Sequence, residues 1–196
     1  MKNLFIYIIR KSIKITNKLL NFLKKIEKQV CKLYYNDDIS CKDEVEGGNG
    51  MANIFDVAKF ILKQQGSMST MKLQKLCYYS QAWSLVWDDD ELFPEEFEAW
   101  ANGPVCRELY NKHQGKYSIS EDDIKQEWLS DKELTDCQKE TIEVVLGHYG
   151  DKNGQWLSTL THMESPWKDT RIGVADGEAC NRIITKEKML MYYEAL

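Results

Sequence analysis

The sequence has few of the residues that interrupt helices. Of its 196 residues only 3 are proline and 11 are glycine, while 43% are hydrophobic. So little proline leaves room for long helices, and the apolar residues recur at helical rather than alternating spacing. The apolar content is enough for one ordinary globular core. We therefore expect a mainly α-helical fold with few strands.

Histidine is scarce, and the cysteines lack the spacing of a metal site. The chain has 3 histidines and 6 cysteines, and neither a C-x-x-C nor an H-E-x-x-H motif occurs in it. Those motifs supply the ligands of many zinc sites and the thiol pairs of redox proteins. The sequence therefore predicts no metal and no cofactor. The cysteines are expected to be reduced thiols in the cytoplasm.

Long apolar runs are also missing. The longest run near the start of the chain, residues 4–9, is six residues long, whereas a membrane span needs about 20. Basic residues flank this run as in a signal peptide, but no small-residue cleavage site follows it. We therefore expect neither secretion nor a membrane partner.

Only the first quarter of the chain has a net positive charge. Residues 1–50 carry 10 Lys and Arg against 6 Asp and Glu, whereas residues 51–196 carry 16 against 25. An acidic body lacks the basic stripe that binds phosphates, so nucleic acid is not an expected partner. The acidic clusters are expected to be solvated and to steer a basic partner protein.

Residues 1–50 allow three interpretations. They could form a basic amphipathic helix on a membrane or partner, an appendage folded onto the body, or a leader that is not part of the natural protein. We favour the leader, because its composition is typical of A/T-rich codons and residues 46–48 can be encoded by a purine-rich ribosome-binding stretch before Met51. Residues 36–50 resemble a linker. We therefore expect the body to comprise residues 51–196.

Caps, breaks and apolar spacing predict the elements of the body. Thr135 and Gln138 match a capping box, and Gly66 can supply a left-handed helix end. Alternation followed by a turn sequence predicts one short extended segment or β-hairpin near residues 92–105. Pro104 is expected in the first turn of the next helix. The expected helices run from Asn53 to Gly66, from Thr70 to the acidic run 88–90, from Pro104 to Gly115, from Thr135 to Gly150, around residues 156–160, and from Thr185 to Leu196.

Two cysteines are candidate nucleophiles. Catalysis would need a histidine beside Cys77 or Cys106, and the spacing leaves open a pairing with His113 or His162. Cys77 lies at a position expected to face the core, where cysteine acts as a small hydrophobe. A small cysteine/histidine hydrolase or transferase is therefore the alternative function, and His162 is expected to be an ordinary hydrogen-bonding residue.

Tryptophan is abundant, with 6 residues. Large aromatic residues dominate both protein cores and the hot spots of interfaces. Trp100 lies opposite the presumed inward face of the extended segment, and Trp167 follows a proline in a polar stretch. These two are the best candidates for exposure among the tryptophans, while packing in the core or at its edge is the default expectation for each. Together with Asn102, in the turn, they are the residues that we expect to bind a partner.

Three segments carry a resemblance to a known family. They are residues 71–83 (MKLQKLCYYSQAW), residues 97–105 (FEAWANGPV) and residues 160–167 (LTHMESPW). In this order they resemble the Panacea domain, also called the SocA-like antitoxin or phage-associated protein family. The resemblance extends over about residues 51–196, and residues 1–50 have no counterpart in it.

The resemblance implies a bacterial or prophage toxin–antitoxin module in which the domain binds and neutralises a cognate protein toxin. One branch of the family is similar to a proteolytic adaptor that delivers its toxin to an ATP-dependent protease. The family supplies no catalytic residues to transfer, so a non-enzymatic cytoplasmic protein is expected. Transcriptional autoregulation by the same chain is disfavoured by the acidic body.

Overall fold

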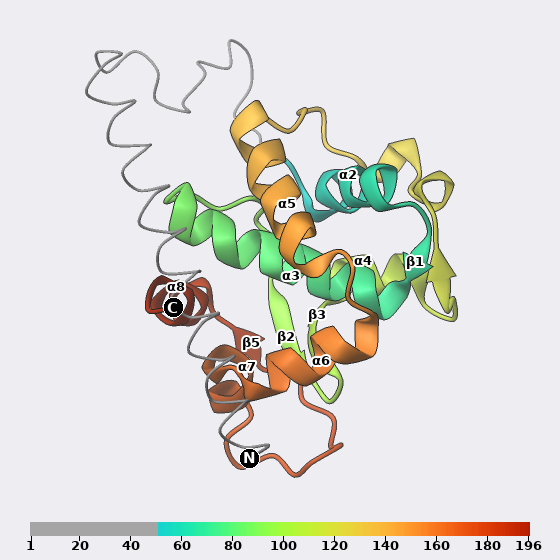
Figure 1. Cartoon of the computed structure of the whole chain (residues 1–196). Coiled ribbons are helices and arrows are strands. Elements are labelled where there is room, and N and C mark those ends of the chain that lie inside the picture. Colours follow the sequence, from blue (N-terminus) through green and yellow to red (C-terminus); the bar gives the residue numbers. More distant parts are fainter. Residues whose placement is uncertain (1–50) are drawn as a thin grey trace, which may run out of the picture. The chain divides into compact units, whose positions relative to one another are not determined.

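The computed structural model describes residues 51–196, drawn in colour in Figure 1. Within this range there are seven α-helices and five strands of two to four residues. This confirms the predicted fold class, mainly α with short strands. The predicted leader or appendage, residues 1–50, lies outside the described residues. No helix in the described range is long and apolar enough to cross a membrane.

The elements follow one another in an order that interleaves short strands with helices. Two 3-10 turns, Glu121–Asp123 and Gln126–Trp128, lie between β4 and α5. The elements are α2 (Ile54–Gln65), β1 (Met68–Ser69), α3 (Thr70–Trp87), β2 (Phe97–Trp100), β3 (Gly103–Cys106), α4 (Arg107–His113), β4 (Ser118–Ile119), α5 (Asp136–Tyr149), α6 (Gly154–Met163), α7 (Ser165–Thr170), β5 (Ile183–Ile184) and α8 (Lys186–Glu194).

Local signals determine several helix ends. The Asn53 side chain accepts hydrogen bonds from the first turn of α2 and forms a capping box with Asp56. Gly66 ends α2 with a φ of 73°, in the left-handed region. Thr135 and Gln138 form the predicted capping box at the start of α5. The structure therefore confirms these predicted helix ends. Caps at helix starts are favourable because they satisfy the N–H groups that the first turn leaves unpaired.

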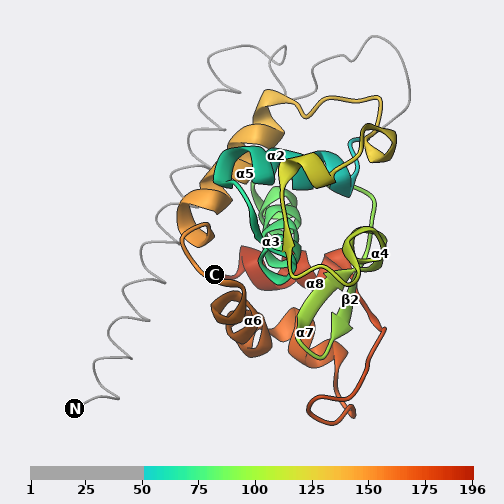
Figure 2. The same ribbon diagram turned by 90° about the vertical axis from the view of Figure 1, so that its right-hand side faces the viewer.

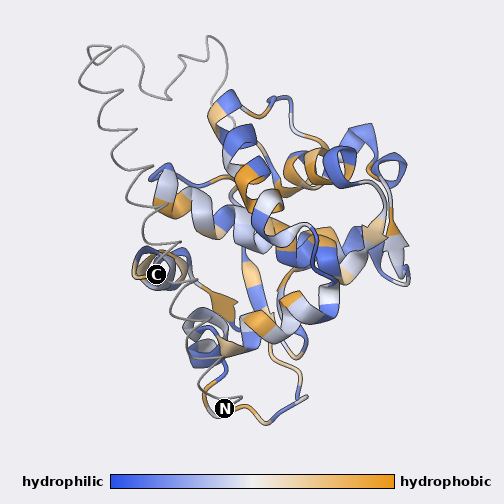
Figure 3. Cartoon of the chain, viewed as in Figure 1, coloured by the Kyte–Doolittle hydropathy of each residue, from blue (hydrophilic) through white to orange (hydrophobic). Residues whose placement is uncertain are grey.

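Helix α3 is the central element of the described body. Every residue from Leu73 to Leu85 is buried, so the helix is covered all round and not only along the one apolar stripe that the sequence indicates. Helices α2 and α5 pack on one side of α3, and α6 and β3 pack on another (Figures 1 and 2). Figure 3 shows hydrophobic residues on the facing sides of α2 and α5.

The predicted hairpin near residues 92–105 is formed by β2 and β3. The two strands are antiparallel, and Trp100 pairs with Gly103 at the turn. Strand β5, from near the end of the chain, adds to the other edge of β2 and pairs Ile184 with Phe97. The sequence pattern did not indicate this third strand, because two residues are too few to show alternation.

The prediction that a helix starts at Pro104 is wrong. Pro104 lies in β3, and α4 begins only at Arg107. Proline has no N–H to donate, and it is tolerated here because β3 is an edge strand of its sheet. The stretch between the predicted helices that end at Gly115 and begin at Thr135 also contains β4, in which Ile119 pairs with Met68 of β1. Helix α7 was likewise not predicted, although Pro166 in its first turn is a common helix start.

Candidate functional site

The three segments that carry the resemblance meet at the turn of the β2–β3 hairpin. Side chains from α3, α6 and the α7 region each donate to a main-chain carbonyl of this hairpin. There are four such donors. We use the name 'hairpin clasp' for these four side chains together with the four carbonyl groups that accept from them. The bonds run from Arg171 Nη1 to Ala99 O (2.7 Å), from Trp167 Nε1 to Trp100 O (2.9 Å), from Ser158 Oγ to Asn102 O (2.9 Å) and from Lys75 Nζ to Pro104 O (2.8 Å).

Lys75 holds the clasp from inside the core. Its side chain is fully buried, and burial lowers the pKa of its ammonium group to about 7. Gly103 makes this approach possible: a Cβ added there would lie 2.7 Å from Lys75 Cε and 2.7 Å from Thr161 Oγ1. Gly103 also has a φ of 96°, which side-chain-bearing residues rarely adopt. Glycine is therefore required at the turn for two separate reasons.

The outer part of the clasp is aromatic. The imidazole of His162 stacks on the Trp167 indole at 4.0 Å, and the Arg171 guanidinium lies 5.1 Å from the centre of that indole. Burial lowers the pKa of His162, and the positive charges of Lys75 and Arg171 lower it further. Within the described part of the chain His162 Nε2 is buried without a hydrogen-bond partner. A hydrogen bond to the main chain of Ala101 acts in the opposite direction on the pKa of His162. His162 therefore packs against Trp167 and also makes a hydrogen bond, as the sequence suggested.

Glu98 organises the solvent side of the hairpin. It accepts two bonds of 2.6 Å from the Arg107 guanidinium and one of 2.7 Å from Trp100 Nε1. Burial raises the pKa of Glu98, but these bonds outweigh it and leave the pKa below its ordinary value. The Trp100 ring also lies edge-on to Tyr110 at 4.7 Å. The polar groups here are satisfied by one another.

The structure brings the predicted binding residues Trp100, Asn102 and Trp167 to one place. Both indole rings are half-buried, and the N–H of each is bonded within the molecule. Asn102 is exposed, and its carbonyl accepts from Ser158. What the geometry shows for these residues is a role in holding the turn, and their part in partner binding stays a prediction.

The candidate cysteines are placed unfavourably for catalysis. Cys77 and Cys106 are buried, and burial raises the pKa of both thiols, so they are protonated at neutral pH. The Cys106 thiol donates to Glu108 at 3.2 Å, and the His113 ring contacts Gln74 at 3.1 Å. Because the thiolate is the nucleophile, this geometry gives no support to a cysteine hydrolase. Among residues 51–196 no three His, Cys, Asp or Glu side chains are grouped as metal ligands.

Glu164, between α6 and α7, is a buried carboxyl group. It accepts a hydrogen bond of 2.7 Å from the Tyr193 hydroxyl and one of 3.2 Å from the Tyr79 hydroxyl. Burial raises its pKa to about 8, although the two hydroxyl bonds act in the opposite direction. Glu164 is therefore largely protonated at pH 7 and joins α3 and α8 to the α6–α7 junction.

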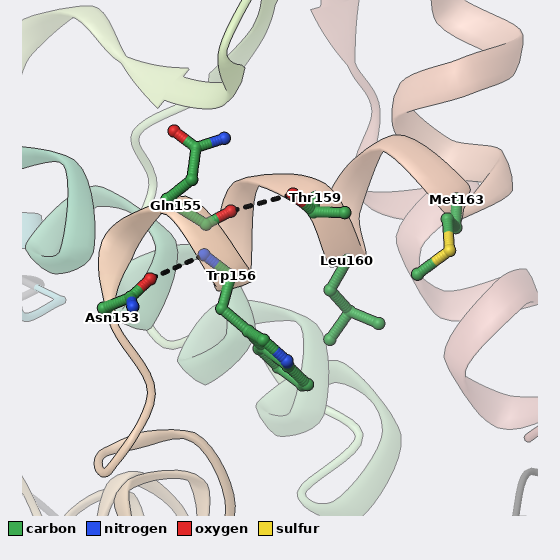
Figure 4. A pocket seen from close by; sticks show the side chains of 6 residues that line it. All are labelled: Asn153, Gln155, Trp156, Thr159, Leu160 and Met163. Carbon is green, nitrogen blue, oxygen red and sulfur yellow. Dashed lines mark hydrogen bonds between the residues drawn. The ribbon is translucent and has the colours of Figure 1, made fainter.

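The outward face of α6 carries an open groove, shown in Figure 4. Trp156, Leu160 and Met163 follow one another at i, i+4 and i+7 on this face, and we call them the α6 stripe. The exposed fraction is 46% for Trp156 and 56% for Met163. The groove encloses roughly 360 Å³ and is also lined by Asn153, Gln155 and Thr159. Sequence reasoning missed it, although the i, i+4, i+7 spacing was there to be found.

Comparison with known families identifies the domain. Residues 73–168 match the family model described as antitoxin SocA-like, Panacea domain. No curated protein and no solved structure matches the chain. The matched range contains the hairpin, the α6 stripe and three of the four clasp donors, Lys75, Ser158 and Trp167. Over residues 73–168 the chain therefore carries a Panacea domain of the SocA-like antitoxin family.

Proposed function

We propose that the protein is the antitoxin of a toxin–antitoxin module and neutralises a cognate protein toxin in the cytoplasm by binding it directly. The observation that carries this proposal is the match of residues 73–168 to the antitoxin family. Two further observations support it. The buried thiols of Cys77 and Cys106 are protonated, and the polar groups of the hairpin are engaged with one another rather than directed at a substrate.

The charge of the body indicates the kind of toxin. Residues 51–196 carry 25 acidic against 16 basic residues, and complementary charge raises the rate at which partners meet. The proposed toxin therefore presents a basic surface. We also propose that the toxin contacts the hairpin turn, through Trp100, Asn102 and Trp167. Of these three residues Asn102 is the exposed one.

The test is expression of the neighbouring open reading frame from an inducible promoter, with and without this chain. We expect growth to stop when the neighbour is expressed alone and to recover when the full chain is present. The purified proteins should elute together in size-exclusion chromatography. A neighbour that is harmless alone, or one whose toxicity this chain does not relieve, would count against an antitoxin.

The mode of neutralisation needs a separate measurement. Direct occlusion leaves the half-life of the toxin unchanged, whereas the adaptor role implied by the family resemblance shortens it in the presence of an ATP-dependent protease. The half-life of the toxin after translation is blocked, measured with and without this chain, separates the two modes. Rescue that persists in cells lacking the protease indicates occlusion, and rescue that is lost in those cells indicates the adaptor mode.

A further inference from the structure

We propose that the hairpin clasp is an acid-sensitive switch: when Lys75 and His162 take up protons, the hairpin turn loosens and the toxin dissociates faster. The inference rests on the proposed function, because it takes the toxin to contact the hairpin turn. It goes further by naming what regulates that contact. Its basis is a group of basic side chains that lie under the turn.

The hairpin turn covers the Lys75 ammonium group. Lys75 is buried, and its Nζ donates to Pro104 O at 2.8 Å. The turn lies so close that a Cβ on Gly103 would be 2.7 Å from Lys75 Cε. Asn102, beside Gly103 in the turn, is exposed, so the turn is the layer between Lys75 and the solvent. When the turn moves away, water reaches the ammonium group.

Basic side chains gather at this turn. The main chain of residues 99–104 accepts hydrogen bonds from three of them, those of Lys75, His162 and Arg171. Arg171 is charged throughout the neutral range, and positive charge on Lys75 and on Arg171 lowers the pKa of His162. Water screens charges weakly in a buried site, so each added proton raises the free energy of the closed form.

Acidic side chains do not offset this charge at Lys75. Within residues 51–196 no carboxylate pairs with Lys75, and none of the charged groups on α2 or α5, which also pack on α3, contributes to its pKa shift. Glu164, at the end of α6, accepts from two tyrosine hydroxyls instead. Asp176 raises the pKa of His162, but burial and the two cations outweigh it. The closed clasp therefore has no counter-ion for a charged Lys75.

The closed clasp becomes less favourable as the pH falls. Burial lowers the pKa of Lys75 to about 7, so in the closed form Lys75 is mostly neutral at pH 8 and mostly charged at pH 6. In the open form water solvates the ammonium group, which then stays charged throughout this range. The open population therefore rises with the charged fraction of Lys75 in the closed form, about tenfold from pH 8 to pH 6. Protonation of His162, whose pKa is also lowered, adds to this rise at the acid end.

Hydrogen exchange of an indole N–H measures the opening in the full chain without a partner. The reporter is the indole of Trp167, whose N–H donates to Trp100 O and is released when the turn lifts. Its protection factor, the exchange rate of free tryptophan divided by the observed rate at the same pH, is measured by NMR at pH 8, 7 and 6. We expect a fall of about fivefold from pH 8 to pH 7 and at least about tenfold by pH 6. The buried indole of Trp83, bonded to the Tyr149 hydroxyl, reports global unfolding and should show no such fall.

Variants assign the pH dependence to the two groups. In Lys75→Met, which keeps an unbranched side chain of similar length, the Trp167 protection factor should change by less than about twofold from pH 8 to pH 7. His162→Gln should keep the fall between pH 8 and pH 7 but limit the further fall to pH 6 to less than about twofold. The matched control is Lys63→Met, the same change at an exposed lysine, and it should follow the wild type. Circular dichroism establishes that each variant is folded, and His162→Gln provides an independent test should Lys75→Met not fold.

Dissociation of the toxic product of the neighbouring gene tests the regulation. A toxin seated on the turn leaves when the turn opens, so its dissociation rate should follow the open population. From pH 8 to pH 6 we expect this rate to rise at least about fivefold more for the wild type than for Lys75→Met, measured by surface plasmon resonance. The comparison between the two proteins cancels the effect of titrating groups on the toxin itself.

Several outcomes would overturn the switch. They are a Trp167 protection factor that does not change with pH, the same change in Lys75→Met as in the wild type, and a parallel loss of protection at Trp83, which would mean global unfolding. Equal pH dependence of toxin dissociation in the wild type and Lys75→Met would show that the clasp does not regulate binding.

The fate of the proposed function can be read separately. The exchange experiment needs no toxin, so it decides whether the clasp opens with acid even if no neighbouring gene is toxic, in which case the antitoxin function is wrong. If the chain neutralises a toxin but the Trp167 protection factor is constant, the antitoxin function stands and the switch is wrong.

Discussion

The imidazole of His162 lies flat against the indole of Trp167, with ring centroids 4.0 Å apart and an angle of 13° between the planes. The same indole lies 5.1 Å from the Arg171 guanidinium and donates its N–H to the carbonyl of Trp100. One ring is thus fixed by a stack, a cation and a hydrogen bond. This arrangement orients the indole so that α7 holds the hairpin turn.

Replacing Trp167 by phenylalanine tests the value of the hydrogen bond. The phenyl ring keeps an aromatic surface for His162, but it leaves the carbonyl of Trp100 without its donor. We expect the free energy of unfolding to fall by about 1–2 kcal/mol in urea denaturation. Trp156→Phe is the control, since that indole is 46% exposed, and it should change stability by less than about 0.5 kcal/mol. Equal effects of the two variants would contradict the role of the bond.

Gly103→Ala should be more harmful than Gly173→Ala. The new methyl group would meet Lys75 and Thr161 at 2.7 Å, and it would also hold an unfavourable positive φ. Overpacking and backbone strain together should cost about 2–4 kcal/mol of unfolding free energy.

Gly173→Ala provides the matched comparison for this turn. Gly173 has a φ of 82° but nothing within 4 Å of an added Cβ, so only the backbone strain of about 1–2 kcal/mol applies. Thermal or urea unfolding of both variants separates the cost of overpacking from the cost of backbone strain. If the two variants lose the same stability, the close packing of Lys75 against Gly103 has no energetic role.

Glu164 should make the folded state less stable as the pH rises from about 4.5 to about 8. Burial raises its pKa from 4.5 to about 8, so in this window the folded state holds a proton that the unfolded state has released. The unfolding free energy then falls with pH, by up to about 1.4 kcal/mol per pH unit. In Glu164→Gln this contribution is absent.

Urea denaturation at pH 5, 6, 7 and 8 measures this effect. The wild type should lose stability relative to Glu164→Gln across the series. Glu143→Gln, a change at an exposed carboxyl group, should run parallel to the wild type. A constant difference between wild type and Glu164→Gln at all four pH values would show that Glu164 is not buried as described.

Lys75 should act in the opposite direction at higher pH. Burial lowers its pKa from 10.5 to about 7, so between these values the unfolded state holds the extra proton. The unfolding free energy of the wild type should rise relative to Lys75→Met as the pH increases from 7 toward 10, by up to about 1.4 kcal/mol per unit. Between pH 7 and pH 8 the terms from Lys75 and Glu164 oppose each other.

The same denaturation experiment, carried out at pH 6.5, 7.5, 8.5 and 9.5, tests Lys75. Lys63→Met is the control, because Lys63 is exposed on α2, and its stability should follow that of the wild type. A stability difference between wild type and Lys75→Met that does not change with pH would mean that water reaches the Lys75 ammonium group.

The parts of the fold that could be predicted depend on near neighbours in the chain. The start of α5 follows from Thr135 and Gln138, and the end of α2 follows from Gly66, because each involves contacts within a few residues. The hairpin was predictable for the same reason. Strand β5 was not, since Ile184 becomes a strand residue only by pairing with Phe97, far away in the sequence.

The candidate site was predictable only in part. Trp100 and Trp167 were singled out separately, but their contact spans 67 positions and no local pattern contains it. The burial of Lys75 and the position of Pro104 were also missed. Both result from the packing of the hairpin against α3, where the carbonyl of Pro104 accepts a hydrogen bond from the Lys75 ammonium group.

By itself the sequence determined the helical class, the helix caps and the family segments, because spacing and capping act over three or four residues. Only the tertiary structure decided which side chains lost contact with water. Burial gives Lys75 and Glu164 their unusual pKa values, and incomplete coverage leaves Trp156 on the surface. Whether water reaches a side chain depends on elements brought together from distant parts of the chain, and no local pattern contains that information.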